Sequence, residues 1–296
     1  MSRIFSVFSS SKSRLFKSLD SRQLVTVQEI KTFQEQGVVC VRGAFREWVD
    51  KLKKGVGANH ANPSKDGEWL KSEDSQTFYF NDYFNWRRIP EFEEFVRSSP
   101  AAEIAGKLMM SEFAVFYHEH VFTKDPGTTR GTPWHQDQPY YPVNGWKNCS
   151  LWLPLTPVSK VSCLKYVGGS HKWRKWFIPR KFASSKNYNY DNANTRSKQE
   201  AFDDIPNIDG EPDKYELFSW DLQPGDCIAF HMLTLHGAKQ TTDTVGRQVV
   251  ATRWLGEDAT FATRPWETSP SYTGGLKPGD AFHTSDTFPV MWRSEQ

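Results

Sequence analysis

The chain has 296 residues, of which 38% are hydrophobic and 15% aromatic. This composition excludes a disordered protein, and the length suffices for one large domain with a substantial core. The 37 basic and 35 acidic side chains leave a net charge of +2. That balance gives no electrostatic basis for binding nucleic acid, which needs clustered Lys and Arg. No apolar run approaches about 18 residues, so no membrane span is predicted.

Residues 1–23 are predicted to be an extension ahead of the folded part. Residues 1–19 contain four basic side chains, seven serines and no acidic one. This pattern is typical of a mitochondrial transit peptide, and a disordered leader with no targeting function fits it equally well. The cysteines are far apart and include no C-x-x-C pair, so they are read as reduced thiols on buried strands. An intracellular protein, cytoplasmic or mitochondrial, is therefore expected. The cysteines are Cys40, Cys149, Cys163 and Cys227.

The first predicted element is a helix that begins near residue 26. Thr26 and Glu29 have the spacing of a capping box, and Gly37 offers a helix stop. The segment VVCVRGAF that follows is predicted to be a buried strand. Residues 44–110 are predicted to be mostly helical, with Pro90 and Pro100 in the first turns of two helices.

After residue 111 the chain changes character. Short β-branched or aromatic runs, bounded by Pro, Gly, Asp and Asn, follow one another without helices between them. This arrangement predicts a mainly β fold, an antiparallel sandwich or barrel, within a single domain over residues 24–296. The runs are FAVFYHEHVF, CSLWLPLTPV, CLKYVGG, DCIAFHMLTLHG and RQVVATRWLG.

Residues 180–216 interrupt the predicted strands with a polar, Asn-rich segment. A loop of this length inside a compact domain is often functional, for instance as a lid over an active site. A disordered insertion is the alternative.

The segment TPWHQDQPYY places His135 two residues before Asp137. On a β-strand, side chains two positions apart point to the same face, so the pair can chelate one metal ion. A third ligand must come from elsewhere. His236 is predicted to end a strand, and Gly237 after it lets the backbone turn away. Two histidines and one carboxylate form the facial triad of non-haem Fe(II) oxygenases.

A triad of this kind leaves positions open for an organic co-substrate and for O2. Arg247 lies eleven residues after His236, at the start of the next predicted strand. Its guanidinium is suited to the distal carboxylate of such a co-substrate, since the fork makes two parallel hydrogen bonds. His118 and His120 alternate on one strand and also qualify as metal ligands. His171 is read as a turn residue, His231 faces the other way on a regular strand, and His60 lies in a polar loop.

Together these residues make the chain resemble the phytanoyl-CoA dioxygenase family of Fe(II)/2-oxoglutarate-dependent oxygenases, over about residues 24–262. The resemblance rests on five segments in order: PWHQDQPYYP, SLWLPLTPVS, LKYVGGSHKW, LQPGDCIAFHMLTLHGA and RQVVATRW. It implies a double-stranded β-helix core, a cupin-like jelly roll with flanking helices. It also implies a hydroxylase that uses Fe(II), 2-oxoglutarate and O2 and releases succinate and CO2.

The resemblance further assigns residues. His135, Asp137 and His236 match the iron ligands and so the catalytic residues, and Arg247 matches the partner of the 2-oxoglutarate C5 carboxylate. Trp152 and Gln136, and more loosely His120, match positions that line the co-substrate pocket.

The chain departs from the family pattern at two places. Ala238 stands where a hydroxyl-bearing residue often assists the arginine, and Gln76 or Thr77 stands near the place of a helical lysine. Arg247 is therefore expected to hold that carboxylate with less help, either alone or assisted by another hydroxyl. Asp137 argues against a halogenase, because halogenating relatives carry a small residue there.

The substrate is expected to be a small organic molecule. Aromatic side chains near the motifs suit a quaternary ammonium or an apolar chain. Basic ones suit a carboxylate, a phosphonate or an acyl-CoA. The C-terminal SEQ gives no support for peroxisomal import. The aromatic residues are Tyr140, Tyr141, Trp146, Trp173, Trp176 and Trp254, and the basic ones are Arg130, Lys147, Arg174, Lys175 and Arg264.

Two other functions keep the β-fold without the oxygenase chemistry. One is a non-catalytic, cupin-like metal- or ligand-binding protein, and the other is a carbohydrate-binding jelly-roll module. Neither requires the triad together with Arg247.

Overall fold

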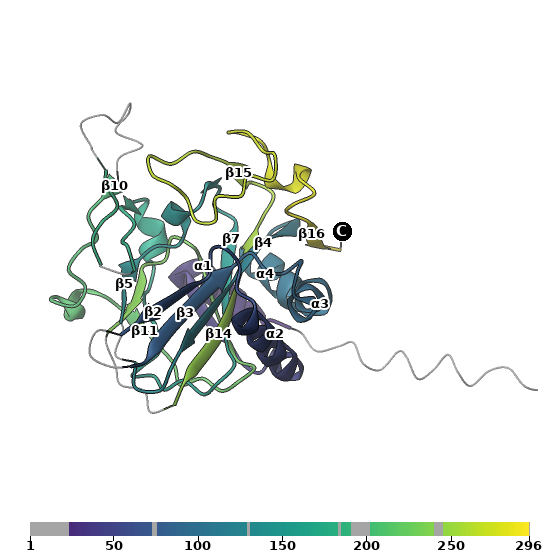
Figure 1. The fold of residues 1–296 in the computed structure, drawn as a ribbon. Helices are drawn as coiled ribbons and strands as arrows, with labels where there is room; N and C mark the ends of the chain where they lie inside the picture. Colours follow the sequence, from purple (N-terminus) through teal and green to yellow (C-terminus); the bar gives the residue numbers. More distant parts are fainter. Residues whose placement is uncertain are drawn as a thin grey trace, which may run out of the picture.

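Two antiparallel β-sheets face one another in the computed structural model, with helices packed outside the larger sheet (Figure 1). The structure describes residues 24–72, 76–128, 131–182, 185–190, 202–239 and 245–295. The predicted extension, residues 1–23, lies outside the described part, as do Arg130 and residues 183–184 and 191–201 of the predicted lid.

The larger sheet has eight strands, and its long strands form the wall that carries Arg247. Seven of them run in the order β1 (Val38–Val41), β12 (Cys227–Phe230), β7 (Asn148–Pro154), β14 (Arg247–Leu255), β4 (Phe113–Lys124), β3 (Phe78–Tyr83) and β2 (Glu68–Lys71). The eighth, β16 (Val290–Arg293), pairs with β4.

The smaller sheet has four strands and carries the histidines of the triad. Its order is β11 (Leu217–Phe218), β8 (Lys165–Val167), β13 (His236–Ala238) and β5 (Thr132–His135). Two short pairs complete the strands: β9 (Trp176–Phe177) with β10 (Phe202–Asp203), and β6 (Val143–Asn144) with β15 (Thr260–Phe261). The expected mainly β, jelly-roll architecture with flanking helices is confirmed.

Side-chain alternation along the larger sheet separates two hydrophobic cores. On β7, Leu151 and Leu153 belong to the cluster under the helices, whereas Trp152 belongs to the cluster between the sheets. On β12, Ala229 and Phe230 divide in the same way. The period of two follows from the pleat, so the inner face of the larger sheet is open to a site between the sheets.

Four helices cover the outer face of the larger sheet. They are α1 (Val27–Gln36), α2 (Val49–Ala61), α3 (Pro90–Ser98) and α4 (Ala101–Met109). The predicted capping box is present in α1, since the Thr26 hydroxyl accepts from the Glu29 N–H and the Glu29 carboxylate accepts from the Thr26 N–H. Gly37 ends this helix with a φ of 72°, a conformation that glycine adopts at little cost.

The prediction for residues 44–110 was wrong in one respect. A hairpin of β2 and β3 lies within this range and extends the larger sheet beyond β4. The segment FYFNDY alternates in burial as a half-buried strand does, yet the polar residues around it obscure the pattern. The first strand is also shorter than predicted, because β1 ends at Val41. The cysteines are free as predicted, and Cys163 lies outside the named strands.

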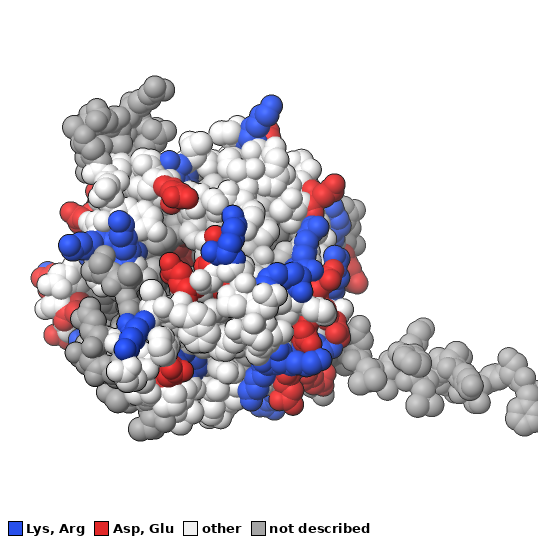
Figure 2. All heavy atoms as spheres, viewed as in Figure 1, with Lys and Arg blue, Asp and Glu red and all other residues white. Residues whose placement is uncertain are grey.

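The described surface carries charges of both signs. On the face shown in Figure 2, lysines and arginines alternate with carboxylates and form no continuous basic field. None of the described helices is both long and apolar enough to span a bilayer.

Candidate active site

The two histidines of the predicted triad lie directly opposite each other on neighbouring strands. His236 on β13 pairs with His135 on β5 in the antiparallel register, and their ring centroids are 4.1 Å apart. Both side chains are buried, with 5% of His135 and 3% of His236 exposed. The strand pairing therefore sets the separation of the two imidazoles.

Asp137 completes the cluster from a different backbone position than predicted. It lies beyond the end of β5, with φ −72° and ψ −44°, just before the 3-10 helix η2 (Gln138–Tyr140). The same-face argument for a continuous strand was therefore wrong for this residue. Its Oδ1 nevertheless lies 3.5 Å from His135 Nε2 and 3.6 Å from His236 Nε2.

Backbone carbonyls fix the orientation of both imidazoles. His135 Nδ1 lies 2.8 Å from the Pro133 carbonyl oxygen, and His236 Nδ1 lies 2.9 Å from that of Thr234. A neutral imidazole that donates from Nδ1 keeps a lone pair on Nε2 for a metal. Burial also lowers the pKa of His236 to about 3, so this ring is neutral near pH 7.

The second oxygen of Asp137 is held by two donors. Oδ2 accepts from the Ser150 hydroxyl at 2.9 Å and lies 3.2 Å from Arg253 Nη2. Burial alone would raise the pKa of Asp137, but the Arg253 guanidinium outweighs burial and holds the pKa well below its usual range. The carboxylate is therefore ionised and presents Oδ1 to the histidines.

The donor set fits a divalent transition metal. One ligand atom from each of His135, Asp137 and His236 lies within 4.8 Å of the others, and all three residues are buried. Two imidazoles and one carboxylate suit non-haem Fe(II), with remaining coordination positions open.

These ligands open into a pocket of about 750 Å³ between the two sheets. Trp152, His120 and Arg247 line it, as the sequence predicts. Gln136 does not belong to the described lining, because its amide bonds to the backbone at Lys175, Leu233 and Phe177. The predicted position of Gln136 in the co-substrate pocket is thus corrected.

Arg247 lies at the start of β14 and is 9% exposed. Its Nη1 donates to the Ser162 carbonyl at 2.8 Å. Ala238, which lacks the hydroxyl common in relatives, is paired in register with Thr132, and Thr132 lines the pocket. Cross-strand partners place their Cβ atoms about 5 Å apart, so a hydroxyl is available beside the position of Ala238.

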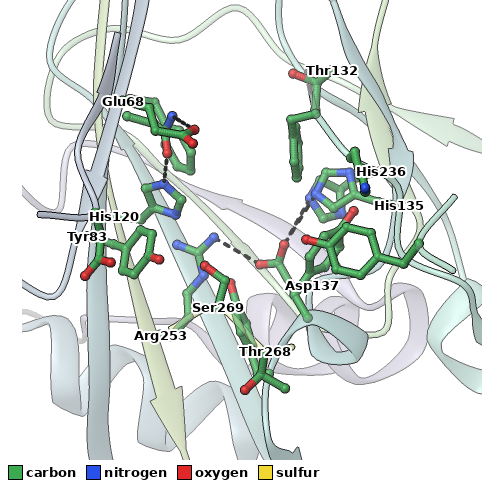
Figure 3. A pocket seen from close by; sticks show the side chains of 18 of the residues that line it. Glu68, Tyr83, His120, Thr132, His135, Asp137, His236, Arg253, Thr268 and Ser269 are labelled. Atoms are coloured by element: carbon green, nitrogen blue, oxygen red, sulfur yellow. Dashed lines mark hydrogen bonds and ion pairs between the residues drawn. The ribbon is translucent and has the colours of Figure 1, made fainter. Parts of the chain in front are cut away.

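His120 lies on the wall opposite the triad (Figure 3). Its Nε2 lies 3.3 Å from Asn81 Oδ1, and the Asn81 amide donates to Glu68. The ring stacks on Phe122 with centroids 3.9 Å apart. Burial lowers the pKa of His120 to about 3, so the ring is neutral. This wall comes from the β2–β3 hairpin and β4.

Sequence reasoning missed several lining residues. Arg253 lies six residues after Arg247 on β14, an even spacing that places both side chains on the inner face. That spacing was the available signal. Trp266 and Glu267 come from a loop after the last recognised motif. Asp66 lies in the turn before β2 and Glu68 begins β2, within the range that was predicted to be mostly helical.

Of the aromatic and basic residues proposed from the sequence as substrate contacts, only two of those that the structure describes line the pocket. Tyr140 and Tyr141 line the pocket, whereas Trp254 is buried under the helices. The described basic candidates do not line it, and Lys147 and Lys175 pair with Glu257 and Asp203. The other aromatic and basic candidates outside the described lining are Trp146, Trp173, Trp176, Arg174 and Arg264.

The other histidines also lie outside the metal cluster. His60 was wrongly placed in a loop, because it lies in α2 with Nε2 3.1 Å from the Thr123 hydroxyl. His171 and His231 pack around Trp146, away from the triad. His118 is buried beside His120 on β4, and its Nδ1 has no hydrogen-bond partner in the described part.

The family model for phytanoyl-CoA dioxygenase (PhyH) matches residues 33–249. The chain belongs to this family. The match spans the triad, β5 and β13, and it ends three residues into β14, after Arg247. No curated protein matches the chain in a sequence comparison.

Solved structures show the same fold at low sequence identity. SnoK, a non-haem α-ketoglutarate-dependent carbocyclase from nogalamycin biosynthesis, is 20% identical with a TM-score of 0.67, over 90% of this chain and 97% of SnoK. The epimerase SnoN, solved with Fe3+, α-ketoglutarate and nogalamycin RO, is 16% identical with a TM-score of 0.67, over 90% and 98% of the two chains. EctD from S. alaskensis, solved with 2-oxoglutarate and 5-hydroxyectoine, is 14% identical with a TM-score of 0.60, over 86% and 82%.

These findings confirm the family, the jelly-roll fold and the assignment to the 2-oxoglutarate-dependent dioxygenases. Fe(II), 2-oxoglutarate and O2 are accordingly its cofactors, and His135, Asp137 and His236 form a group that could hold the metal.

Proposed function

We propose that this dioxygenase hydroxylates an unactivated C–H bond of a small organic substrate and releases succinate and CO2. The observation that carries the proposal is the buried set of His135 Nε2, Asp137 Oδ1 and His236 Nε2 at the base of a pocket that also contains Arg247. A bound ferrous ion would supply the activation of O2, coupled to oxidative decarboxylation of 2-oxoglutarate.

The co-substrate end of the pocket is assigned to Arg247. Its guanidinium is buried at the start of β14, where a carboxylate would form charge-assisted hydrogen bonds with little competition from water. Thr132 is the proposed source of the hydroxyl that Ala238 does not provide, since the two residues are cross-strand partners. Trp152 lines the same pocket and excludes water from it.

Residues 180–216 contribute to the proposed shielding of the site. Phe182 packs edge-on against His135 with ring centroids 4.9 Å apart, and Tyr188 also lines the pocket. The Tyr140 hydroxyl anchors this wall by donating to the Arg180 carbonyl at 2.6 Å and accepting from the Arg180 N–H at 2.8 Å. Among the described residues of the predicted lid, Lys181, Phe182, Tyr188 and Asn189 line the pocket, and residues 202–216 do not.

The shielding role has a direct test. Removing the Phe182 ring opens the metal site to water, so Phe182→Ala should consume more 2-oxoglutarate per molecule of product. An unchanged ratio of succinate to product would contradict it.

The substrate end of the pocket lies between the triad and the hairpin wall. Aromatic rings and charges of both signs line it, including Tyr83, Trp266, Glu68 and Lys181. A substrate panel should therefore contain a quaternary ammonium, a carboxylic acid and an acyl-CoA of similar chain length. Within this panel, a charged group is expected to improve binding relative to its neutral analogue.

The central experiment measures O2-dependent succinate formation from 2-oxoglutarate with added Fe(II). His135→Ala should abolish it, while His171→Gln, which changes a buried imidazole outside the pocket, should retain it. The alternative of a non-catalytic, cupin-like binding protein predicts metal binding without succinate in the wild type. The mass of the product then tests whether the reaction is a hydroxylation. Hydroxylation adds one oxygen atom, whereas cyclisation removes two hydrogens and epimerisation leaves the mass unchanged.

A further inference from the structure

Arg253 contacts the metal-binding carboxylate from the side away from the histidines. Its Nη2 lies 3.2 Å from Asp137 Oδ2, and only 4% of either residue is exposed. We propose that Arg253 is a positioning residue that, together with Ser150, restricts Asp137 to binding a metal through Oδ1 alone. The proposal builds on the metal site of the proposed function.

The two carboxylate oxygens have separate surroundings. Oδ1 lies 3.5 and 3.6 Å from the Nε2 atoms of His135 and His236. Oδ2 is occupied by the Ser150 hydroxyl and the Arg253 guanidinium. Rotating the carboxylate to present both oxygens to a metal would break both contacts in a buried environment, where an unpaired charge is costly.

The two residues that contact Asp137 Oδ2 lie on neighbouring strands of the larger sheet. Ser150 on β7 and Arg253 on β14 are direct cross-strand partners in the antiparallel register. The loop after β5 brings Asp137 from the smaller sheet to this pair. The contact therefore joins the two sheets at the metal site, and it fixes the carboxylate before a metal binds.

The burial of Arg253 itself depends on Asp137. Its Nε and Nη1 have no hydrogen-bond partner among the described residues. The groups that face it, His118, His120 and Tyr141, are neutral or uncharged at pH 7, since burial lowers the pKa of both histidines and raises that of the tyrosine. Asp137 therefore supplies the compensating charge. The guanidinium remains protonated and cannot itself coordinate a metal, so it orients the ligand without competing for the ion.

Figure 3 shows the arrangement: Arg253 reaches across the floor of the pocket to Asp137, between the His120 and Tyr83 wall and the histidines. The sheet thus provides an outer partner to the carboxylate, comparable to the carbonyls that orient the imidazoles. Outer partners of metal ligands typically contribute 10- to 100-fold in metal affinity.

The test is the dissociation constant for Mn(II) alone, measured on the full chain by the EPR signal of free Mn(II). Arg253→Gln should weaken Mn(II) binding about 10- to 100-fold. Arg253→Lys, which keeps the charge but not the fork, should recover part of the loss, and Ser150→Ala should weaken binding by a smaller factor. The control is Arg42→Gln, which removes a guanidinium paired with Asp226 outside the pocket and should leave the constant unchanged.

A purely structural role makes a different prediction. In that case Arg253→Gln would lower the Tm of the apo protein, while the folded variant would keep the wild-type dissociation constant for Mn(II). That result would overturn the proposal. If Arg253→Gln does not fold, unchanged constants in both Arg253→Lys and Ser150→Ala would overturn it equally. Because Mn(II) binding requires no turnover, a wild type that binds Mn(II) but never forms succinate would refute the proposed function and leave this inference standing.

Discussion

His135 and His236 are cross-strand partners in β5 and β13, so the pairing of two short strands sets the geometry of the metal site. The carbonyls two residues before each histidine, at Pro133 and Thr234, orient the two rings in the same way. Asp137, the third residue of the site, lies in the loop that follows β5. The site is thus a property of the β13–β5 ladder and of the contact between Asp137 and the larger sheet.

Removing one imidazole should abolish function. His236→Ala leaves two ligands for the metal, and we expect Fe(II)-dependent succinate formation to fall by more than about 100-fold, since loss of an outer partner alone costs 10- to 100-fold in affinity. Activity assays with saturating 2-oxoglutarate and increasing Fe(II) check this expectation. Activity near that of the wild type would exclude His236 as a ligand.

Gly237 should be intolerant of a side chain. A Cβ there would lie 3.0 Å from the Trp134 backbone N and Cα and 3.1 Å from the Thr132 carbonyl oxygen. The glycine therefore permits close approach of β13 and β5, which differs from the turn predicted from the sequence. Gly237→Ala should reduce the unfolding free energy by roughly 1–3 kcal/mol and weaken metal binding. A urea titration of the apo protein checks the first effect, and an unchanged midpoint would contradict it.

Arg247 should control affinity for the co-substrate. A hydrogen bond to a charged group is worth about 1.5–3 kcal/mol, so Arg247→Gln should raise the KM for 2-oxoglutarate by roughly 10- to 100-fold. Arg247→Lys should give an intermediate value because a lysine cannot form the bidentate pair. Steady-state kinetics with varied 2-oxoglutarate measure both, and equal KM values in all three proteins would assign the carboxylate to another residue.

His231 should make the apo protein sensitive to acid. Its Nε2 lies 2.7 Å from the Trp146 carbonyl and its Nδ1 accepts from the Leu233 N–H, so both ring nitrogens are used by the neutral form. Burial, with His171 nearby, lowers the pKa of His231 to about 3. In the unfolded chain the value is about 6.5. Between these values only the unfolded state binds the proton, so this contribution to stability is complete above pH 6.5 and is lost as the pH falls towards 3.

The pH effect can be isolated by substitution. His231→Gln should lose less unfolding free energy than the wild type between pH 7 and pH 4, by on the order of 3 kcal/mol at most. Urea titrations of the apo proteins at several pH values test this. Parallel pH profiles would show that His231 does not titrate differently in the two states.

The sequence was sufficient for the fold class and for naming the three side chains that the structure brings together. A local sequence pattern indicated each of these residues. The short spacing indicated His135 and Asp137, a predicted strand end indicated His236, and a predicted strand start indicated Arg247. The jelly-roll prediction followed from the antiparallel runs and the family resemblance, because patterns of this kind are local. The sequence also predicted both ends of α1 correctly: the capping box of Thr26 and Glu29, and Gly37 at the C-terminal end.

What the sequence did not provide depends on tertiary contacts. The β2–β3 hairpin is half-buried and polar, so its pairing with β4 is decided by the sheet it joins. The side chain of Gln136 bonds to the backbone at Leu233, far away in the chain, and no local pattern reveals that. The pairing of Arg253 with Asp137 likewise requires knowledge of how the loop after β5 crosses to the larger sheet.

The most direct test of the central claim is an anomalous difference map at the iron absorption edge, from crystals prepared without O2 in the presence of Fe(II) and 2-oxoglutarate. We expect one strong peak within coordination distance of His135 Nε2, Asp137 Oδ1 and His236 Nε2. A peak bound by other residues, or none between these three side chains at full Fe(II) loading, would contradict it.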